Sequence, residues 1–353
     1  MRRGLISWSK TELPESVFAA RVERVRAAMA QEGLDALVLY TNNTRPGAVT
    51  WLTAFVPYWA EGLLVVPRTG DPLLTMAFSN RVVGWGKSVS RVARFEGTPR
   101  FGIAAGKYLA DNGAKKVGVA DLGGLRLAVA NDLTEAATGA QLSDATTLFE
   151  RARAKADTAE IALVAKAGTI AREALAQVLG SEGQLGDAIA AVDGAARLAG
   201  AEEVYMAAAP DLDRDHRFRR IEGPAARGER FALRATVAYK GSWVRVTRTI
   251  SRDRAEASLH DRAAETFAAA VAQLPSAAGF ANFRSWLVEG CRLAQPLDPL
   301  MGSMMSEPRA PAPESLVTAQ AVVEVDGRKV ALAAPVLIGA AGAPASFLVH
   351  PLF

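Results

Sequence analysis

The stretch from Arg230 to Ile250 constrains the fold of this 353-residue chain more than any other. From Phe231 to Tyr239 every second residue is apolar, which is the period of a strand with one buried face. Lys240-Gly241 suits a tight turn, because glycine readily takes a positive φ. The residues from Trp243 to Ile250 are rich in Val and Thr, which favour a returning strand. The sequence therefore predicts a β-hairpin here.

Two arginines give this hairpin an unusual character. If the turn is centred near Tyr239-Lys240, Arg234 faces Arg245 on the neighbouring strand. Two like charges at such close range repel each other. We therefore expect an acidic group beside them, contributed either by the protein or by a ligand.

The hairpin resembles that of the pita-bread metallopeptidases, which include prolidase, aminopeptidase P, methionine aminopeptidase and the related creatinase. Their pattern is G-D-x-[apolar]3-D-x-G-x4-G-Y-x2-D-x-T-R-T. Gly228-Glu229 matches its first pair, Gly241 matches a later glycine, and Thr247-Arg248-Thr249 matches the T-R-T. The two aspartates of the pattern, which are the family's first two metal ligands, fall on Arg234 and Arg245. The resemblance thus predicts the family's framework and contradicts its metal site.

The composition disfavours several classes of protein. Half of the residues are apolar, and a chain of this length is expected to form two domains. The net charge of +4 is spread along the chain, so we expect no nucleic-acid partner. The single cysteine, Cys291, excludes an intrachain disulfide and a cysteine-based zinc cluster. We find no signal peptide and no apolar run of about 20 residues, and therefore expect a cytoplasmic protein without a membrane partner.

The first 150 residues alternate between predicted strands and helices, which is typical of an α/β domain. Pro14 to Glu32 has the apolar spacing of a helix, and Ala36 to Tyr40 that of a buried strand. This part resembles the N-terminal domain of prolidases and creatinase, and Trp51 to Phe55 loosely matches a second motif of that domain. By analogy with creatinase-like dimers, the loop from Arg45 to Trp59 would line the site of a partner subunit.

A domain boundary is predicted near residue 150. The segments Glu150–Lys155 and Thr158–Ile161 resemble the linker that opens the first helix of the family's catalytic domain. Asp157 or Thr158 is suited to cap that helix. Further helices are predicted over 185–199, 256–273 and 280–294, and closing strands over 317–325 and 329–338. The sequence thus predicts an N-terminal α/β domain over residues 1–150 and an α+β pita-bread domain over residues 151–353.

The metal site implied by the resemblance is largely missing from the sequence. The family supplies two Asp, one His and two Glu to a pair of divalent ions that activate a water molecule. Arg234 and Arg245 replace the aspartates, and an arginine cannot ligate a metal. The histidine falls on Pro299 and the second glutamate on Ala333, so Glu324 is the one ligand retained. We therefore expect no metal and no cofactor.

His216 is the candidate catalytic residue. It follows the acidic cluster Asp211–Asp215, and several arginines surround it, so that a solvated loop is one interpretation. The other interpretation rests on the resemblance. In creatinase, which uses no metal, the histidine at this place acts as general base and acid, a task that suits an imidazole. His260 and His350 are weaker candidates.

Two glutamates are candidates to face the arginine pair. Glu324 is the retained ligand, and Glu307 matches the glutamate of the family's H-E-x-P segment. In one interpretation Glu324 neutralises an arginine in a buried network, which is stable only if every charge is paired. In the other, Arg234 and Arg245, with Arg248 of the T-R-T nearby, bind a carboxylate or another anion bidentately. The sequence leaves both interpretations open, and each can hold for one arginine.

Three classes of function remain. The first is a metal-free homologue of Xaa-Pro peptidases without peptidase activity, which binds a small anionic molecule, a peptide or a partner subunit. The second is a metal-independent hydrolase of C–N bonds, with His216 as acid and base and the arginines holding a small carboxylate, guanidino or amide substrate. The third, a two-metal aminopeptidase, is disfavoured by the missing ligands. We expect a homodimer, or a heterodimer with an intact paralogue.

Overall fold

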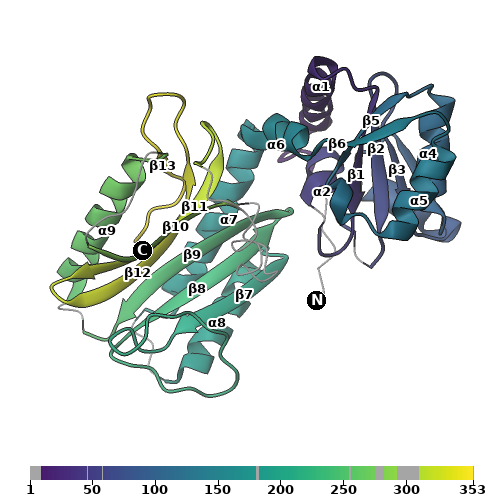
Figure 1. Ribbon diagram of the computed structural model, residues 1–353. Coiled ribbons are helices and arrows are strands. Elements are labelled where there is room, and N and C mark those ends of the chain that lie inside the picture. The colour runs from purple at the N-terminus through teal and green to yellow at the C-terminus, as the bar shows by residue number, and fades with distance from the viewer. Residues whose placement is uncertain are drawn as a thin grey trace. The chain divides into compact units, whose positions relative to one another are not determined.

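The computed structural model describes residues 9–45, 47–57, 59–179, 183–253, 256–275, 282–291 and 310–352. The chain divides into two compact units, Met1–Ala154 and Lys155–Phe353 (Figure 1). The boundary predicted after residue 150 falls inside the last helix of the first unit. None of the helices among the described residues combines the length and the apolarity that crossing a bilayer requires.

The first unit is an α/β sandwich, as its alternating pattern predicts. Its six-stranded sheet has the order β4-β3-β2-β1-β5-β6. Val38 of the central strand packs toward α4 and α5, whereas Leu37 and Leu39 pack toward α1 and α6, so the sheet is buried on both faces. Its elements are α1 (Glu15–Gln31), β1 (Ala36–Thr41), α2 (Gly47–Thr53), β2 (Gly62–Pro67), β3 (Leu73–Met76), the 3-10 turn η1 (Asn80–Val82), α3 (Val83–Ser88), β4 (Arg94–Gly97), α4 (Phe101–Asp111), β5 (Lys116–Ala120), η2 (Leu122–Gly124), α5 (Leu127–Ala136), β6 (Gln141–Asp144) and α6 (Thr146–Ala154).

The second unit is an antiparallel sheet with helices on one side (Figure 1). Its strand order is β10-β11-β12-β9-β8-β7, and β13 pairs with β12. Phe267 of α9 packs with alternate residues of β11 and β12, such as Val323 and Leu332. The elements are α7 (Thr158–Ala176), α8 (Leu185–Leu198), β7 (Glu203–Ala209), β8 (Arg230–Tyr239), β9 (Ser242–Ser251), α9 (Ala257–Ala272), β10 (Phe283–Gly290), β11 (Leu316–Val325), β12 (Arg328–Leu337) and β13 (Ser346–Phe347).

The start of α7 follows the predicted capping rule. The side chain of Asp157 accepts a hydrogen bond of 2.8 Å from the backbone N–H of Glu160. This bond satisfies one of the free N–H groups at the helix start.

The hairpin forms as predicted, but its register differs by one step. Tyr239 pairs with Ser242, and Lys240 and Gly241 form the turn with φ of +48° and +74°. Arg234 therefore lies opposite Thr247, and Arg245 lies opposite Thr236. The expectation that the two arginines face each other directly is wrong. They are diagonal neighbours on one face, because a two-residue turn centred between Lys240 and Gly241 shifts the pairing.

One predicted helix is a strand. The sequence from 280 to 294 spaces its apolar residues in a way that also fits a helix, but Phe283–Gly290 forms β10, which pairs with β11. Short apolar runs do not distinguish the two by periodicity alone, and here pairing with β11 decides. The strand β7, which pairs with β8, was not predicted either.

Candidate functional site

The face of the second sheet that carries Arg234, Arg245, Thr247 and Gln320 is named the polar face. Side chains that are directly paired across neighbouring strands point to the same side of a sheet. Arg234 pairs with Thr247, Thr247 with Ala333, and Ala333 with Gln320, so these residues form one row across four strands. Ala207 and Leu287 extend the row at its two ends. The helices α7, α8 and α9 lie on the other side (Figure 1).

Arg245 is held by an ion pair that crosses this face. Its guanidinium donates to the carboxylate of Glu289 on β10, although β12 and β11 lie between their strands. Gln320 Nε2 donates to the same carboxylate at 2.9 Å, and Arg245 Nε lies 3.4 Å from Thr236 Oγ1. The side chains of Arg245 and Glu289 thus meet above the strands between them and are both well buried.

The electrostatics of this pair follow from its burial. Burial raises the pKa of the Glu289 carboxyl, whereas Arg245 and Arg234 act in the opposite direction. A buried carboxylate of this kind remains ionised when it is paired and hydrogen-bonded. Glu289 is therefore the acidic group that the two arginines led us to expect.

Arg234 is placed differently, although it lies on the next strand. Its Cζ lies 4.1 Å from the centroid of the Phe218 ring. Its Nε atom is buried without a hydrogen-bond partner, and no described residue forms an ion pair with its guanidinium. Burial, and then the nearby Arg245, lower the pKa of Arg234 to about 10. The group stays charged at neutral pH, and it lacks a direct counter-ion among the described residues.

The hydroxyl of Thr247 is a second polar atom without a partner. Thr247 lies directly opposite Arg234 on β9, and its Oγ1 is buried with no hydrogen bond. A buried hydroxyl left in this state costs free energy. Two neighbouring unsatisfied groups therefore mark one place on the polar face.

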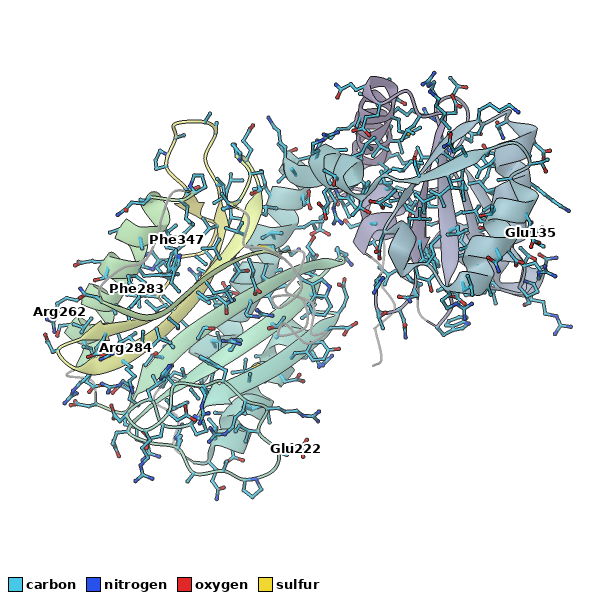
Figure 2. The ribbon with its side chains drawn as sticks, in the orientation of Figure 1. Glu135, Glu222, Arg262, Phe283, Arg284 and Phe347 are labelled. Atoms are coloured by element: carbon cyan, nitrogen blue, oxygen red, sulfur yellow. The ribbon has the colours of Figure 1, made fainter. Side chains whose placement is uncertain are left out.

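The structure separates the other predicted site residues from this place. Glu324 also lies on β11, but it is four residues further along than Gln320 and forms an ion pair with Arg284, which Figure 2 labels. Four residues of strand span about 13 Å. Glu324 therefore does not face the arginine pair, and Arg284 lowers its pKa. Glu307 lies outside the described residues, as does Pro299.

The side chain of Arg248 lies on the opposite side of the sheet from the polar face. It is 1% exposed and donates to the carbonyl oxygens of Thr247 at 2.8 Å, Ala333 at 2.9 Å and His350 at 2.5 Å. Burial lowers its pKa to about 9. These bonds tie the C-terminal tail to the sheet, so Arg248 does not join Arg234 as a ligand-binding residue.

His216 lies in the connection between β7 and β8 and is half-buried. It precedes Phe218, the residue whose ring contacts Arg234, by two positions. Asp215 next to it is paired with Arg217, and these side-chain and backbone hydrogen bonds lower the pKa of Asp215 to about 2. The acidic cluster is thus partly neutralised by its own arginines, as the solvated-loop interpretation expects.

The residues at this place do not fit a pair of divalent metal ions. Such ions require carboxylate oxygens and imidazole, whereas Arg234, Arg245, Thr247, Ala333 and Gln320 provide two cations, a methyl group, a hydroxyl and an amide. In the part of the chain that the structure describes, no three His, Cys, Asp or Glu side chains gather as a metal-holding group.

Sequence reasoning missed Glu289 and Phe218. Glu289 lies in the segment that was predicted to be a helix, so its direction could not be inferred. Phe218 lies in an irregular connection, where no periodicity predicts which way a side chain points. The only signal for Glu289 was the requirement for an acid near two buried arginines.

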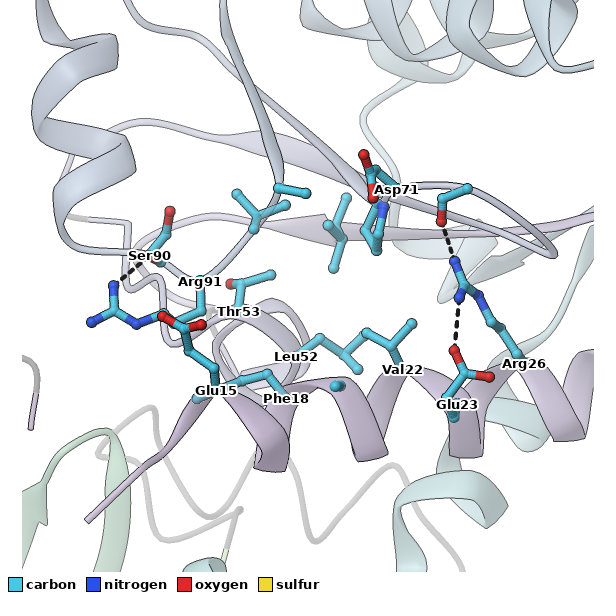
Figure 3. A pocket seen from close by; sticks show the side chains of 16 residues that line it. Glu15, Phe18, Val22, Glu23, Arg26, Leu52, Thr53, Asp71, Ser90 and Arg91 are labelled. Carbon is cyan, nitrogen blue, oxygen red and sulfur yellow. Dashed lines mark hydrogen bonds and ion pairs between the residues drawn. The ribbon is translucent and has the colours of Figure 1, made fainter. Parts of the chain in front are cut away.

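The first unit contains a groove of about 520 Å³ between α1 and the β2–β3 turn. Figure 3 shows Phe18, Val22 and Leu52 on its apolar floor, with Arg91 and Arg26 at opposite ends. Arg26 bonds to Glu23 at 2.7 Å and to the carbonyl of Pro67 at 3.0 Å, and Arg91 donates to the carbonyl of Ser90 at 3.0 Å. Both cations are tied to the chain, so the polar face remains the better candidate site.

Comparison with known proteins supports the architecture of both units. Residues 21–155 match the family model of the Creatinase/Prolidase N-terminal domain. A Xaa-Pro dipeptidase from Bacillus anthracis superposes with a TM-score of 0.70 at 15% sequence identity, covering 94% of this chain and 97% of that chain. The chain has the pita-bread fold. Its N-terminal unit matches the Creatinase/Prolidase N-terminal domain, and its C-terminal unit supplies the sheet-rich half.

Other solved structures of this fold also superpose on nearly the whole chain. The prolidase from Pyrococcus furiosus has a TM-score of 0.66 at 17% identity and covers 93% of this chain and 98% of that chain. Proline aminopeptidase P II from Yersinia pestis has a TM-score of 0.70 at 13% identity, with 97% of both chains covered. Comparison with curated protein sequences finds no significant match. At these identities the likeness concerns the fold.

Proposed function

We propose that this pita-bread protein is a metal-free homologue of the Xaa-Pro peptidases that lacks peptidase activity and binds a small anion on the polar face. The observation that carries the proposal is the state of Arg234, a half-buried guanidinium without a counter-ion among the described residues. An ionised group in this setting is costly unless something pairs with it. A small anion would supply the missing charge.

The division of roles between the two arginines supports this proposal. Arg245 already has Glu289, with Gln320 completing the bonds of that carboxylate. It therefore acts as a structural cation at a place where the family's framework holds a metal ligand. Arg234 keeps its hydrogen-bonding capacity for a ligand, in the bidentate manner that guanidinium favours.

A thermal-shift screen tests the proposal. Wild type, Arg234→Gln and the exposed control Arg217→Gln are heated with carboxylates, phosphates, sulfate and short peptides, and with Mn²⁺, Co²⁺ and Zn²⁺. A ligand that binds only the folded state raises the midpoint by mass action. We expect an anion to stabilise wild type and Arg217→Gln but not Arg234→Gln, and we expect no stabilisation by the metals. Stabilisation by a metal together with dipeptide hydrolysis would overturn the proposal.

A second candidate function is favoured by the position of His216, two residues before Phe218. In this alternative the protein is a metal-independent hydrolase, with His216 as general acid and base on an anionic substrate held by Arg234. Turnover of a ligand found in the screen that disappears in His216→Ala, while its binding persists, would establish this role. Binding without any turnover leaves the first function.

The oligomeric state belongs to the same proposal. We propose a dimer, either of two copies or with an intact paralogue, by analogy with creatinase-like proteins. Light scattering after size-exclusion chromatography measures the mass directly. A monomer at all concentrations would contradict this part and leave the anion site unaffected.

A further inference from the structure

We propose that the polar face binds a singly charged carboxylate that carries a compact hydrocarbon group. The carboxylate lies on the Nη edge of Arg234, and the hydrocarbon lies against Phe218 and the small side chain of Ala207. This inference rests on the proposed function and names the chemical class of its ligand.

The charge of the ligand follows from the groups around Arg234. The charged neighbours of its guanidinium among the described residues are Arg245 and Glu289. Two cations and one carboxylate leave a net charge of +1. One negative charge brings the group to neutrality, whereas a dianion leaves a buried negative charge uncompensated, which costs free energy.

The carboxylate follows from the geometry of the donors. Phe218 covers one face of the Arg234 guanidinium, so a ligand approaches its edge. Nε is enclosed, which leaves the edge formed by the two Nη atoms. Two parallel N–H groups on such an edge match the two oxygens of a carboxylate. The Oγ1 of Thr247, directly opposite Arg234, is enclosed like Nε, so the two Nη atoms are the donors that a ligand can reach.

The hydrocarbon group follows from the neighbours of these donors. Ala207, which is half-buried and has a small side chain, lies directly beside Arg234 in this row. Phe218 also packs against an apolar cluster on the adjoining part of this face, formed by Ala209, Leu212, Ala232, Val322 and Ala331. A ligand with an apolar body therefore gains burial that acetate or sulfate cannot.

Isothermal titration of the full chain at pH 8 in low chloride tests this class. The probes are phenylacetate, acetate, the neutral phenylacetamide and phenylphosphate, which is a dianion at this pH. We expect phenylacetate to bind wild type at least about tenfold more tightly than each of the others, because it alone meets both the charge and the burial requirement.

One variant locates the binding. Arg234→Gln is expected to abolish phenylacetate binding, because it removes both the charge and the paired Nη donors. Arg217→Gln, an exposed arginine of the same connection, is the matched control and is expected to bind as wild type. The unfolding midpoint verifies that each variant is folded, and removal of the unpaired Arg234 charge is not expected to prevent folding.

The outcomes separate this inference from the proposed function. Tighter binding of phenylphosphate, or equal binding of phenylacetamide, overturns the carboxylate class; the former keeps an anion site at Arg234. Binding of phenylacetate that persists in Arg234→Gln overturns the location. If neither this panel nor the broader anion screen binds wild type at all, both the inference and the proposed function are wrong.

Discussion

Arg234 and Arg245 lie on the same face of two paired strands, yet their side chains have different partners. Arg245 donates to Glu289, which in turn accepts from Gln320. Arg234 stacks on Phe218 and has no carboxylate partner among the described residues. The same side chain therefore serves as a structural cation in one place and as an unsatisfied donor a few ångströms away. A buried arginine indicates a ligand site only when its partner is missing.

The largest effect is expected from removing the partner of Arg245. Glu289→Ala leaves the buried Arg245 without a counter-ion, and this is expected to cost about 3–5 kcal/mol of the free energy of unfolding. Urea denaturation of the variant against wild type measures it. The matched control is Glu324→Gln, which breaks the exposed ion pair with Arg284 and is expected to change stability little. A loss as small as that of the control would show that Arg245 does not depend on Glu289.

The turn at Lys240-Gly241, which sets the register of the two arginines, is expected to make the stability of the protein depend on pH. Glu202 accepts from the backbone N–H groups of Lys240, at 2.7 Å, and Gly241, at 3.3 Å, and burial raises its pKa to about 7. In the unfolded chain its value is 4.5. Between pH 4.5 and 7, Glu202 is ionised in the unfolded chain but still protonated in the folded protein. The free energy of unfolding that Glu202 contributes is therefore fully present below pH 4.5 and is lost as the pH rises through 7. The loss is about 3 kcal/mol at most.

Glu202→Gln tests this effect, because it removes the titration and keeps an acceptor for the turn. Denaturation between pH 5 and 8 is expected to show a smaller decline in stability for the variant than for wild type. Parallel declines would mean that Glu202 is ionised in the folded state throughout, held by the two N–H groups and by Lys240 at 3.9 Å.

A gain in stability is expected at the unpaired arginine. Arg234→Met removes a charge that lacks a direct counter-ion and retains an apolar stem against Phe218, which is expected to stabilise the protein by about 1–2 kcal/mol while ligand binding is lost. The unfolding free energy of the ligand-free variant measures this. A clear loss of stability would instead show that Arg234 has a structural partner like that of Arg245, and the contrast between the two would disappear.

The sequence predicts the framework of this site better than its chemistry. Alternation from Phe231 to Tyr239 identifies the hairpin, and Asp157 identifies the start of α7, because both follow local rules. The register of the hairpin depends on which two residues form the turn. A shift of the turn by one residue changes the two arginines from directly facing residues to diagonal neighbours. Glu289 could not be assigned, because its role depends on β10 pairing with β11, a long-range contact that no local pattern encodes.

The smallest effect is expected from restoring the two aspartates of the family pattern. The double variant Arg234→Asp, Arg245→Asp places carboxylates on β8 and β9, where the resemblance puts the first two metal ligands. Two further obstacles remain within the described residues: Ala333 stands opposite Thr247, and Gln320 stands opposite Ala333, so that the neighbouring strands offer no carboxylate in this row.

Two carboxylates do not complete a two-metal centre, which requires several anionic ligands to hold both ions around a shared water. In addition, Glu289 would then face new carboxylates instead of Arg245, and like charges repel. We therefore expect no Mn²⁺- or Co²⁺-dependent hydrolysis of Xaa-Pro dipeptides by the double variant, measured beside the Arg217→Gln control. Metal-dependent turnover would mean that the remaining ligands come from elsewhere in the chain. It would also show that both arginines simply replace metal ligands, instead of serving as a structural cation at Arg245 and an anion-binding group at Arg234.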